Sequence, residues 1–209
     1  MLALLDYGAG NIRSVEKALH AAGAEVVRTA SAEDLDRAQG LVLPGVGAFD
    51  DCLNALQRQR LDDAVRGWIA KGRPFLGICV GYQALFDRSE EFNSCARGLG
   101  IFRGPVVRFK PTPQEPQLKI PQIGWNEVEI VHPDCPLFAG IPQRSHFYFV
   151  HSYHPEQADP SIVASWTEYG QRFASAVCRD HIWATQFHPE KSQQVGLRLL
   201  RNFVEFTRR

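Results

Sequence analysis

Several features are missing from this 209-residue sequence, and each absence argues against a class of protein. The chain has no net charge, because 23 Lys and Arg balance 23 Asp and Glu, so neither nucleic acid nor an anionic membrane is favoured as a partner. No stretch approaches the roughly 20 apolar residues that a membrane span needs. The apolar start, Met1 to Leu5, ends at Asp6 and is too short for the hydrophobic part of a secretion signal.

The cysteine pattern also argues against certain classes of protein. The five cysteines are odd in number and show no metal-ligand spacing, which argues against a disulfide framework and a metal site. We therefore expect a cytoplasmic protein, or one in a similarly reducing compartment, that needs no metal or other cofactor. The length and the 44% content of hydrophobic residues fit a single globular domain over residues 1–209.

The order of apolar segments indicates the fold. In the first half, strands alternate with helical patterns, which predicts a parallel sheet covered on both faces. The expected strands are 2–5, 24–29 and 40–43, and the expected helical segments are 12–22 and 48–71. The second half changes to strands joined by turns, at 101–109, 123–131, 146–150, 162–166 and 173–187, before a closing helix at 191–207. The sequence thus predicts an α/β fold with a mostly parallel sheet and a more antiparallel C-terminal half.

Cys79 has the surroundings of a catalytic nucleophile. It lies in the run PFLGICVGYQ, where an apolar strand leads into a helix expected at 82–86. Glycines on both sides allow the sharp strand-to-helix turn that projects a nucleophile. A thiol at a helix N-terminus is favoured as the thiolate. The alternative is that Cys79 is a small buried apolar residue, as most free cysteines are.

The run TQFHPEKS supplies a candidate base. We expect a strand at 181–187 that delivers His188 and then Glu190. Residues two apart in extended backbone point the same way, so both side chains are expected on one face. The Glu190 carboxylate can then accept from one imidazole nitrogen and leave the other for the thiol. The alternative is that the His-Pro pair only marks a helix start.

Two glycine-rich loops follow strands. The loop Pro44 to Phe49, PGVGAF, offers backbone amides that can point at an oxyanion, together with the N–H of Val80, the residue after Cys79. The alternative is a simple strand-to-helix turn. The loop at 8–10 is similar to a dinucleotide-binding motif, but Arg13 stands where the third glycine belongs.

Together, GICVGYQ, QFHPEKS and PGVGAF resemble the class I (triad) glutamine amidotransferases. Three further runs, DYGAGNIRSV, IGWNEV and FYFVHSY, resemble the glutaminase subunits of imidazole glycerol phosphate synthase. The resemblance implies a three-layer αβα, flavodoxin-like fold. One departure is Tyr82, where these subunits often have Met, and we expect it to reshape the floor of the pocket without touching the triad.

The resemblance also implies a mechanism. Cys79 would attack the side-chain amide of glutamine, ammonia would leave, and water would hydrolyse the thioester, with His188 moving protons and Glu190 fixing its tautomer. The implied oxyanion donors are Val46, Gly47 and Val80, and the implied glutamine contacts are Gly45, Gln83, Ser152 and Tyr153.

In the family, the glutaminase docks on a (β/α)8-barrel cyclase subunit to form a heterodimer. The ammonia reaches the cyclase, which makes imidazole glycerol phosphate and aminoimidazole carboxamide ribotide. The positions that match the cyclase-facing surface are Asn11, Trp125, Tyr148 and Lys191. For Trp125, burial in the core is the alternative to an interface anchor.

Three other functions stay open at this point. The glutaminase of another synthase should lack DYGAGN and GWNEV. A thiol peptidase such as a γ-glutamyl hydrolase would cleave γ-glutamyl peptides without releasing ammonia. A non-enzymatic protein of the same fold would tolerate Cys79→Ala.

Overall fold

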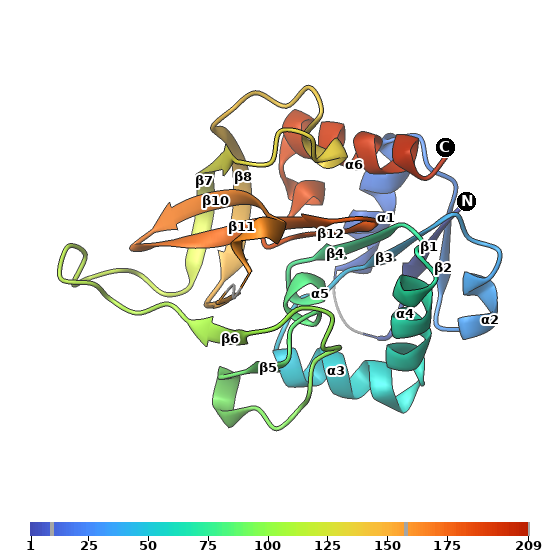
Figure 1. Cartoon of the computed structure of the whole chain (residues 1–209), viewed down its shortest axis with the longest axis horizontal. Helices are drawn as coiled ribbons and strands as arrows, with labels where there is room; N and C mark the ends of the chain where they lie inside the picture. The colour runs from blue at the N-terminus through green and yellow to red at the C-terminus, as the bar shows by residue number, and fades with distance from the viewer. Residues whose placement is uncertain (9–10, 157–158, 209) are drawn as a thin grey trace.

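A mixed sheet forms the centre of the molecule (Figure 1). The structure is a computed structural model that describes residues 1–8, 11–156 and 159–208, so Ala9 and Gly10 of the first glycine loop lie outside the described residues. The strand order is β2 (Val26–Thr29), β1 (Leu2–Leu5), β3 (Gly40–Leu43), β4 (Phe75–Ile78), β12 (Ile182–Thr185), β11 (Gln171–Arg179), β10 (Val163–Tyr169), β7 (Gln122–Ile130) and β8 (Ser145–His151).

The direction of the strands changes at β12, as the sequence predicts. Strands β2, β1, β3, β4 and β12 run parallel to one another. From β12 onward, β11, β10, β7 and β8 pair antiparallel. Every residue of β1, β3, β4 and β12 is buried, which is typical of parallel strands with both faces covered.

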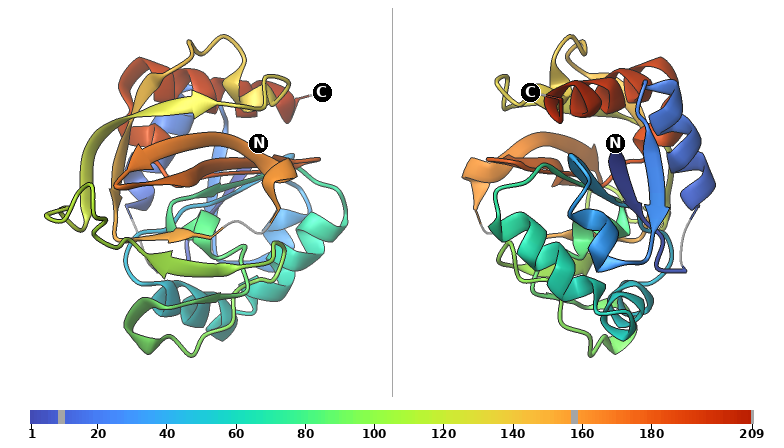
Figure 2. Two further views of the ribbon diagram at one scale, coloured as in Figure 1. Left: turned by 60° about the vertical axis from the view of Figure 1, so that its left-hand side comes forward. Right: turned by 90° about the vertical axis from the view of Figure 1, so that its right-hand side faces the viewer.

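Helices cover the two faces of the sheet and give three layers (Figure 2). Helices α1 (Ile12–Ala21) and α6 (Gln193–Phe206) lie together on one side. The other side carries α2 (Ala32–Leu35), α3 (Phe49–Arg58) and α4 (Leu61–Ala70). The single helical region expected at 48–71 is therefore two helices, and they are separated by Arg60, which adopts a left-handed φ of 55°.

A second, three-stranded sheet was not expected from the sequence. It contains β5 (Arg88–Ser89), β6 (Pro105–Arg108) and β9 (Tyr153–Pro155), with β9 antiparallel to β6. The remaining short elements are the helix α5 (Val80–Gln83) and the 3-10 helices η1 (Glu91–Asn93), η2 (Pro136–Phe138), η3 (Pro160–Ile162) and η4 (Pro189–Lys191). This sheet ties the segment after β8 to the chain that follows α5.

The topology brings the predicted site residues to one edge of the main sheet. Strands β3, β4 and β12 are neighbours and parallel, so their carboxyl ends meet at the same edge. The loop that starts at Pro44, the turn at Cys79 and the segment leading to His188 follow these three strands. Ligands of open α/β sheets bind at this edge. Within the described part of the chain, no helix is both long and apolar enough to cross a membrane.

Candidate active site

Cys79 occupies a strained turn between β4 and α5. Its backbone has φ 55° and ψ −107°, outside the regions that residues with a side chain normally adopt. Its N–H donates to the carbonyl oxygen of Thr185 at 2.7 Å, which ties the turn to β12. Helix α5 begins at Val80, immediately after Cys79 and two residues earlier than expected.

Close backbone contacts explain the glycines that flank Cys79. A Cβ at Gly81 would collide with the carbonyl of Leu43, and a Cβ at Gly77 would lie 2.8 Å from the carbonyl oxygen of Gly81. Both contacts are between backbone atoms, so no side chain can move aside to make room. The sharp turn that the sequence predicts is therefore present, and it requires small residues at these positions.

His188 and Glu190 form a buried pair, although not by the expected route. Strand β12 ends at Thr185, and Glu190 lies in the 3-10 helix η4. The prediction that His188 and Glu190 share one face of extended backbone is therefore wrong, because the chain between them is not extended. The 3-10 turn instead folds the carboxylate back, so that Nδ1 of His188 lies 2.7 Å from Oε1 of Glu190, with both side chains 1% exposed.

The backbone of His188 is fixed from two sides. Its N–H donates to the carbonyl oxygen of Tyr148 in β8 at 2.9 Å. Its carbonyl oxygen accepts from the Ser192 hydroxyl at 2.6 Å, and the same hydroxyl accepts from the N–H of Tyr148 at 3.0 Å. Ser192, which our sequence interpretation did not single out, therefore holds His188 and strand β8 together.

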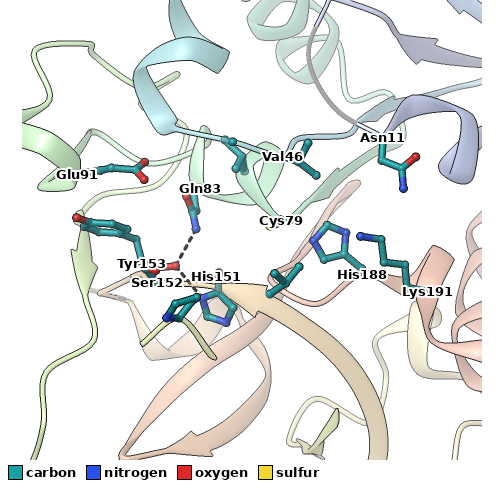
Figure 3. A pocket seen from close by; sticks show the side chains of 14 residues that line it. Asn11, Val46, Cys79, Gln83, Glu91, His151, Ser152, Tyr153, His188 and Lys191 are labelled. Atoms are coloured by element: carbon teal, nitrogen blue, oxygen red, sulfur yellow. Dashed lines mark hydrogen bonds between the residues drawn. The ribbon is translucent and has the colours of Figure 1, made fainter. Parts of the chain in front are cut away.

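The imidazole of His188 and the thiol of Cys79 line one cavity of about 430 Å³. Figure 3 shows Cys79 in the middle of this cavity, with His188 and Lys191 on one side and Gln83 and Tyr153 on the other. Nε2 of His188 makes no hydrogen bond to any described residue, so this nitrogen is available to the reaction.

Two opposing effects set the charge of His188. Burial lowers its pKa, but the negative charge of a Cys79 thiolate and the hydrogen bond to Glu190 outweigh burial and raise the pKa to about 10. His188 is therefore an imidazolium near neutral pH, and it lines the same cavity as Cys79. A thiol and a protonated imidazole at one site are the groups that nucleophilic catalysis with proton transfer requires.

The structure brings most of the other predicted site residues to this cavity. Its lining includes Val46, Gly47, Val80, Gln83, Ser152 and Tyr153. Gly45 lines instead a much smaller cavity beside Glu190. The N–H of Val80 donates to the carbonyl oxygen of Gly45 at 3.4 Å, so in this conformation it is directed at the glycine loop.

Tyr82 does not form the floor of the pocket, contrary to expectation. Its side chain is completely buried, and its hydroxyl donates to the carbonyl oxygen of Ala174 at 3.3 Å. The ring packs edge-on against Phe86, with ring centroids 5.4 Å apart. Because α5 is helical from Val80, Tyr82 faces the core while Gln83 faces the cavity.

Three further polar residues at the site were not singled out from the sequence. Glu91 lines the cavity, and its carboxylate accepts from the N–H of Phe49 at 2.7 Å; burial raises its pKa. His151 lines the cavity and donates from Nδ1 to the carbonyl oxygen of Tyr153 at 2.8 Å. Gln186 is fully buried, with its amide nitrogen 3.7 Å from the sulfur of Cys79.

Only two of these three residues carried a sequence signal. His151 and Gln186 stand inside the runs FVHSY and QFHPEKS, which pointed to their neighbours. Glu91 lies in an irregular segment with no periodic pattern, so only its three-dimensional contacts identify it. Among the described residues, no group of three His, Cys, Asp or Glu side chains could hold a metal ion.

The residues that match a cyclase-facing surface lie close together. The rings of Trp125 and Tyr148 are 6.0 Å apart, and Nζ of Lys191 is 5.7 Å from the centre of the Tyr148 ring. Lys191 and Asn11 also line the cavity, so the cluster adjoins it. Trp125 is 43% exposed, which rules out the alternative that it is a core residue.

Comparison with known proteins agrees with this geometry. The family model described as glutamine amidotransferase class-I matches residues 3–206. A protein named imidazole glycerol phosphate synthase subunit HisH, from Synechococcus sp. strain JA-3-3Ab, is 50% identical over 209 residues that cover 100% of this chain and 94% of that protein. The protein of the same name from Syntrophotalea carbinolica is 47% identical over 205 residues, covering 97% of this chain and 98% of that protein.

A crystal structure of a glutamine amidotransferase shares the fold, with a TM-score of 0.75 at 21% identity over 100% of this chain and 99% of that one. The family match and the two relatives each span almost the whole chain. The chain belongs to the class-I glutamine amidotransferase family, and it is a glutamine amidotransferase.

Proposed function

We propose that this chain is the glutaminase subunit of an imidazole glycerol phosphate synthase of histidine biosynthesis. It hydrolyses L-glutamine to glutamate and ammonia and passes the ammonia to a (β/α)8-barrel cyclase subunit, which produces imidazole glycerol phosphate and aminoimidazole carboxamide ribotide. The observation that carries the proposal is that Cys79 and His188 line one cavity while Glu190 holds the imidazole of His188 from behind. The names of the relatives support the choice of synthase.

The proposed chemistry uses Cys79 as a thiolate and His188 as an imidazolium. The sulfur of Cys79 attacks the side-chain carbonyl carbon of glutamine, and His188 donates its Nε2 proton to the amide nitrogen as the C–N bond breaks. Ammonia leaves and a thioester remains. His188, now neutral, takes a proton from water, the resulting hydroxide attacks the thioester, and the C–S bond breaks to give glutamate and restore the thiolate. Glu190 keeps the imidazole oriented throughout because it accepts from Nδ1.

The cavity suits the free amino acid. Glutamine carries an α-ammonium group, which a carboxylate can bind. Among the described residues that line the cavity, Glu91 has the acidic side chain. Both N–H groups of the Gln83 amide are already engaged, with Tyr153 and Gln186, so its carbonyl oxygen is the atom that it can offer to a substrate N–H. We propose that these two residues, with the Ser152–Tyr153 backbone, select glutamine.

The hydrogen bond between Val80 and Gly45 supports dependence on a partner. An oxyanion donor contributes about 3 kcal/mol to transition-state stabilisation. The Val80 N–H is one proposed donor, and in this conformation it is engaged at 3.4 Å by the glycine loop. A shift of the loop containing Val46 and Gly47 would release it. We therefore expect weak glutamine hydrolysis by the isolated chain and a strong increase with the substrate-loaded cyclase. Equal turnover in both states would contradict this expectation.

Replacing Cys79 tests the proposal directly. With purified cyclase, Cys79→Ala should abolish product formation from glutamine and leave the reaction driven by ammonium salt intact, because only ammonia generation needs the thiolate. Product formation is followed with each nitrogen source, and the ammonia released from glutamine is measured in parallel. Cys95→Ala is the matched control, because Cys95 is exposed and does not line the cavity. Glutamine-driven synthesis that survives Cys79→Ala would reject the mechanism.

Replacing Trp125 tests the interface. Exposed aromatic side chains that anchor an interface typically contribute about 2 kcal/mol or more, so Trp125→Ala should weaken cyclase binding by roughly 30-fold or more. Titration calorimetry or fluorescence anisotropy gives the dissociation constant. Phe92→Ala is the control, because Phe92 is 83% exposed but lies on a different element. Equal losses for both variants would argue against this surface.

A further inference from the structure

A buried amide contacts the nucleophile from the segment between β12 and the base. Gln186 follows Thr185, the last residue of β12, and its side chain is 0% exposed. Its Nε2 lies 3.7 Å from the sulfur of Cys79, a normal separation for an N–H donor and the larger sulfur acceptor. The backbone N–H of Gln186 donates to the carbonyl oxygen of Ser175 in β11 at 2.9 Å, so the sheet holds the residue in place.

Neighbouring groups decide which end of the Gln186 amide faces the sulfur. The carbonyl oxygen of Tyr153 can only accept, so the Gln83 atom 2.8 Å from it must be the amide nitrogen. The same nitrogen, Nε2 of Gln83, lies 3.3 Å from the side-chain amide of Gln186. The Gln186 atom at this contact must be an acceptor and is therefore Oε1. Nε2 of Gln186 must then face Cys79. A single backbone carbonyl thus fixes the orientation of two side-chain amides.

We propose that Gln186 is a positioning residue that donates an N–H hydrogen bond to the thiolate of Cys79 and links it, through Gln83, to the substrate-binding segment at Tyr153. This inference rests on the proposed role of Cys79 as nucleophile. A buried anion is costly unless donors replace the water that it loses, and hydrogen bonds to charged acceptors are the stronger ones. Cys79 is 3% exposed, so donors from the protein must supply this stabilisation.

The pH dependence of thiol alkylation tests the proposal, because a hydrogen bond to the thiolate changes its protonation and a purely structural role does not. The experiment uses the full chain with Cys95→Ser, since Cys95 is the exposed cysteine among the free thiols of the described chain. Iodoacetamide labelling of the Cys79 peptide is followed by mass spectrometry over a range of pH. Gln186→Met keeps the length of the side chain and removes the donor, and Gln186→Glu replaces the donor with a negative charge.

We expect the midpoint of the alkylation profile to rise by about one pH unit in Gln186→Met, so that labelling at pH values well below the midpoint becomes about tenfold slower. The midpoint of Gln186→Glu should be higher still. Ser175→Ala is the matched control: its side chain is buried and contacts Ser165, its carbonyl holds the Gln186 backbone, and neither touches the sulfur. Its midpoint should not move.

A midpoint that is unchanged in both folded Gln186 variants would overturn the inference. Circular dichroism checks folding, and if neither variant folds, Gln83→Met decides the question, because it removes the bond that orients the Gln186 amide and should also raise the midpoint. The proposed function is tested separately: glutamine turnover that persists in Cys79→Ala would reject it. An unchanged midpoint combined with loss of that turnover would leave Cys79 as the nucleophile and remove only the role of Gln186.

Discussion

At the scale of single residues, His188 shows how burial and charge compete. Its side chain is 1% exposed, which favours the neutral imidazole, yet its pKa is raised to about 10 because a thiolate and a carboxylate lie beside it. The raised pKa of His188 therefore depends on its neighbours Cys79 and Glu190. Without Cys79, the same imidazole would have a lower pKa.

This coupling gives a prediction. In Cys79→Ala the negative charge that raises the pKa of His188 is lost while burial stays, so the pKa should fall, by about 1 to 3 units. Titration of the His188 ring by NMR gives the value. Cys52→Ala should leave it unchanged, because Cys52 is a buried thiol whose pKa burial raises to about 12 and which does not line the cavity. An unaltered His188 titration in Cys79→Ala would show that the pair does not interact.

At the scale of elements, the turn between β4 and α5 is the critical piece of local structure. It holds Cys79 at a positive φ and packs Gly81 directly against the backbone of Leu43 at the end of β3. The position of Cys79 therefore depends on two strands: β4, which precedes it, and β3, which Gly81 of α5 contacts. The glycine loop that starts at Pro44 follows the same β3 strand, so the turn also sets the spacing between Cys79 and that loop.

Gly81→Ala should destabilise the protein by about 1–3 kcal/mol or more, because the added methyl group collides with backbone that cannot move aside. Denaturant unfolding measures the loss, and glutaminase activity should fall with it. Gly67→Ala is the control: Gly67 lies inside α4 with nothing within 4 Å of an added Cβ, so stability should rise by about 0.5–1 kcal/mol. A stable and active Gly81→Ala variant would contradict the packing argument.

At the scale of the whole molecule, buried histidines make folding depend on pH. Burial lowers the pKa of His151 to about 3 and that of His154 to about 4. In the unfolded chain both titrate near ~6.5. Below that pH the unfolded state binds protons that the folded state does not, so their contribution to stability is lost as the pH falls. The raised pKa of His188 acts in the opposite direction, and its contribution is lost as the pH rises toward about 10.

We therefore expect the free energy of unfolding to fall between pH ~6.5 and ~4, by up to about 1.4 kcal/mol per pH unit for each of the two histidines. Urea unfolding at a series of pH values gives the slope. His154→Gln should reduce the slope while His151 still contributes. A stability that does not change over this range would show that the two rings are not neutral in the folded chain.

Much of the site follows from local sequence. The glycines around Cys79 predict the sharp turn because only small residues fit against neighbouring backbone, and the apolar runs at 2–5 and 40–43 predict strands buried on both faces. Parallel order then places the ends of β3, β4 and β12 at one edge. The pairing of His188 with Glu190 was expected for the wrong reason, since a 3-10 turn and not a strand creates it.

By itself the sequence determined the candidate residues Cys79, His188 and Glu190 and most strands of the main sheet, because turn geometry and burial patterns are local properties. Only the tertiary structure decided the contacts around them: the small sheet that holds Tyr153, the place of Glu91, and the amide pair Gln83 and Gln186, which are 103 positions apart. These depend on the packing of distant strands and helices. The pattern of residues within one segment does not predict which distant side chain completes a hydrogen bond. The contact of Gln186 with Cys79 exists because β4 and β12 are neighbours in the sheet.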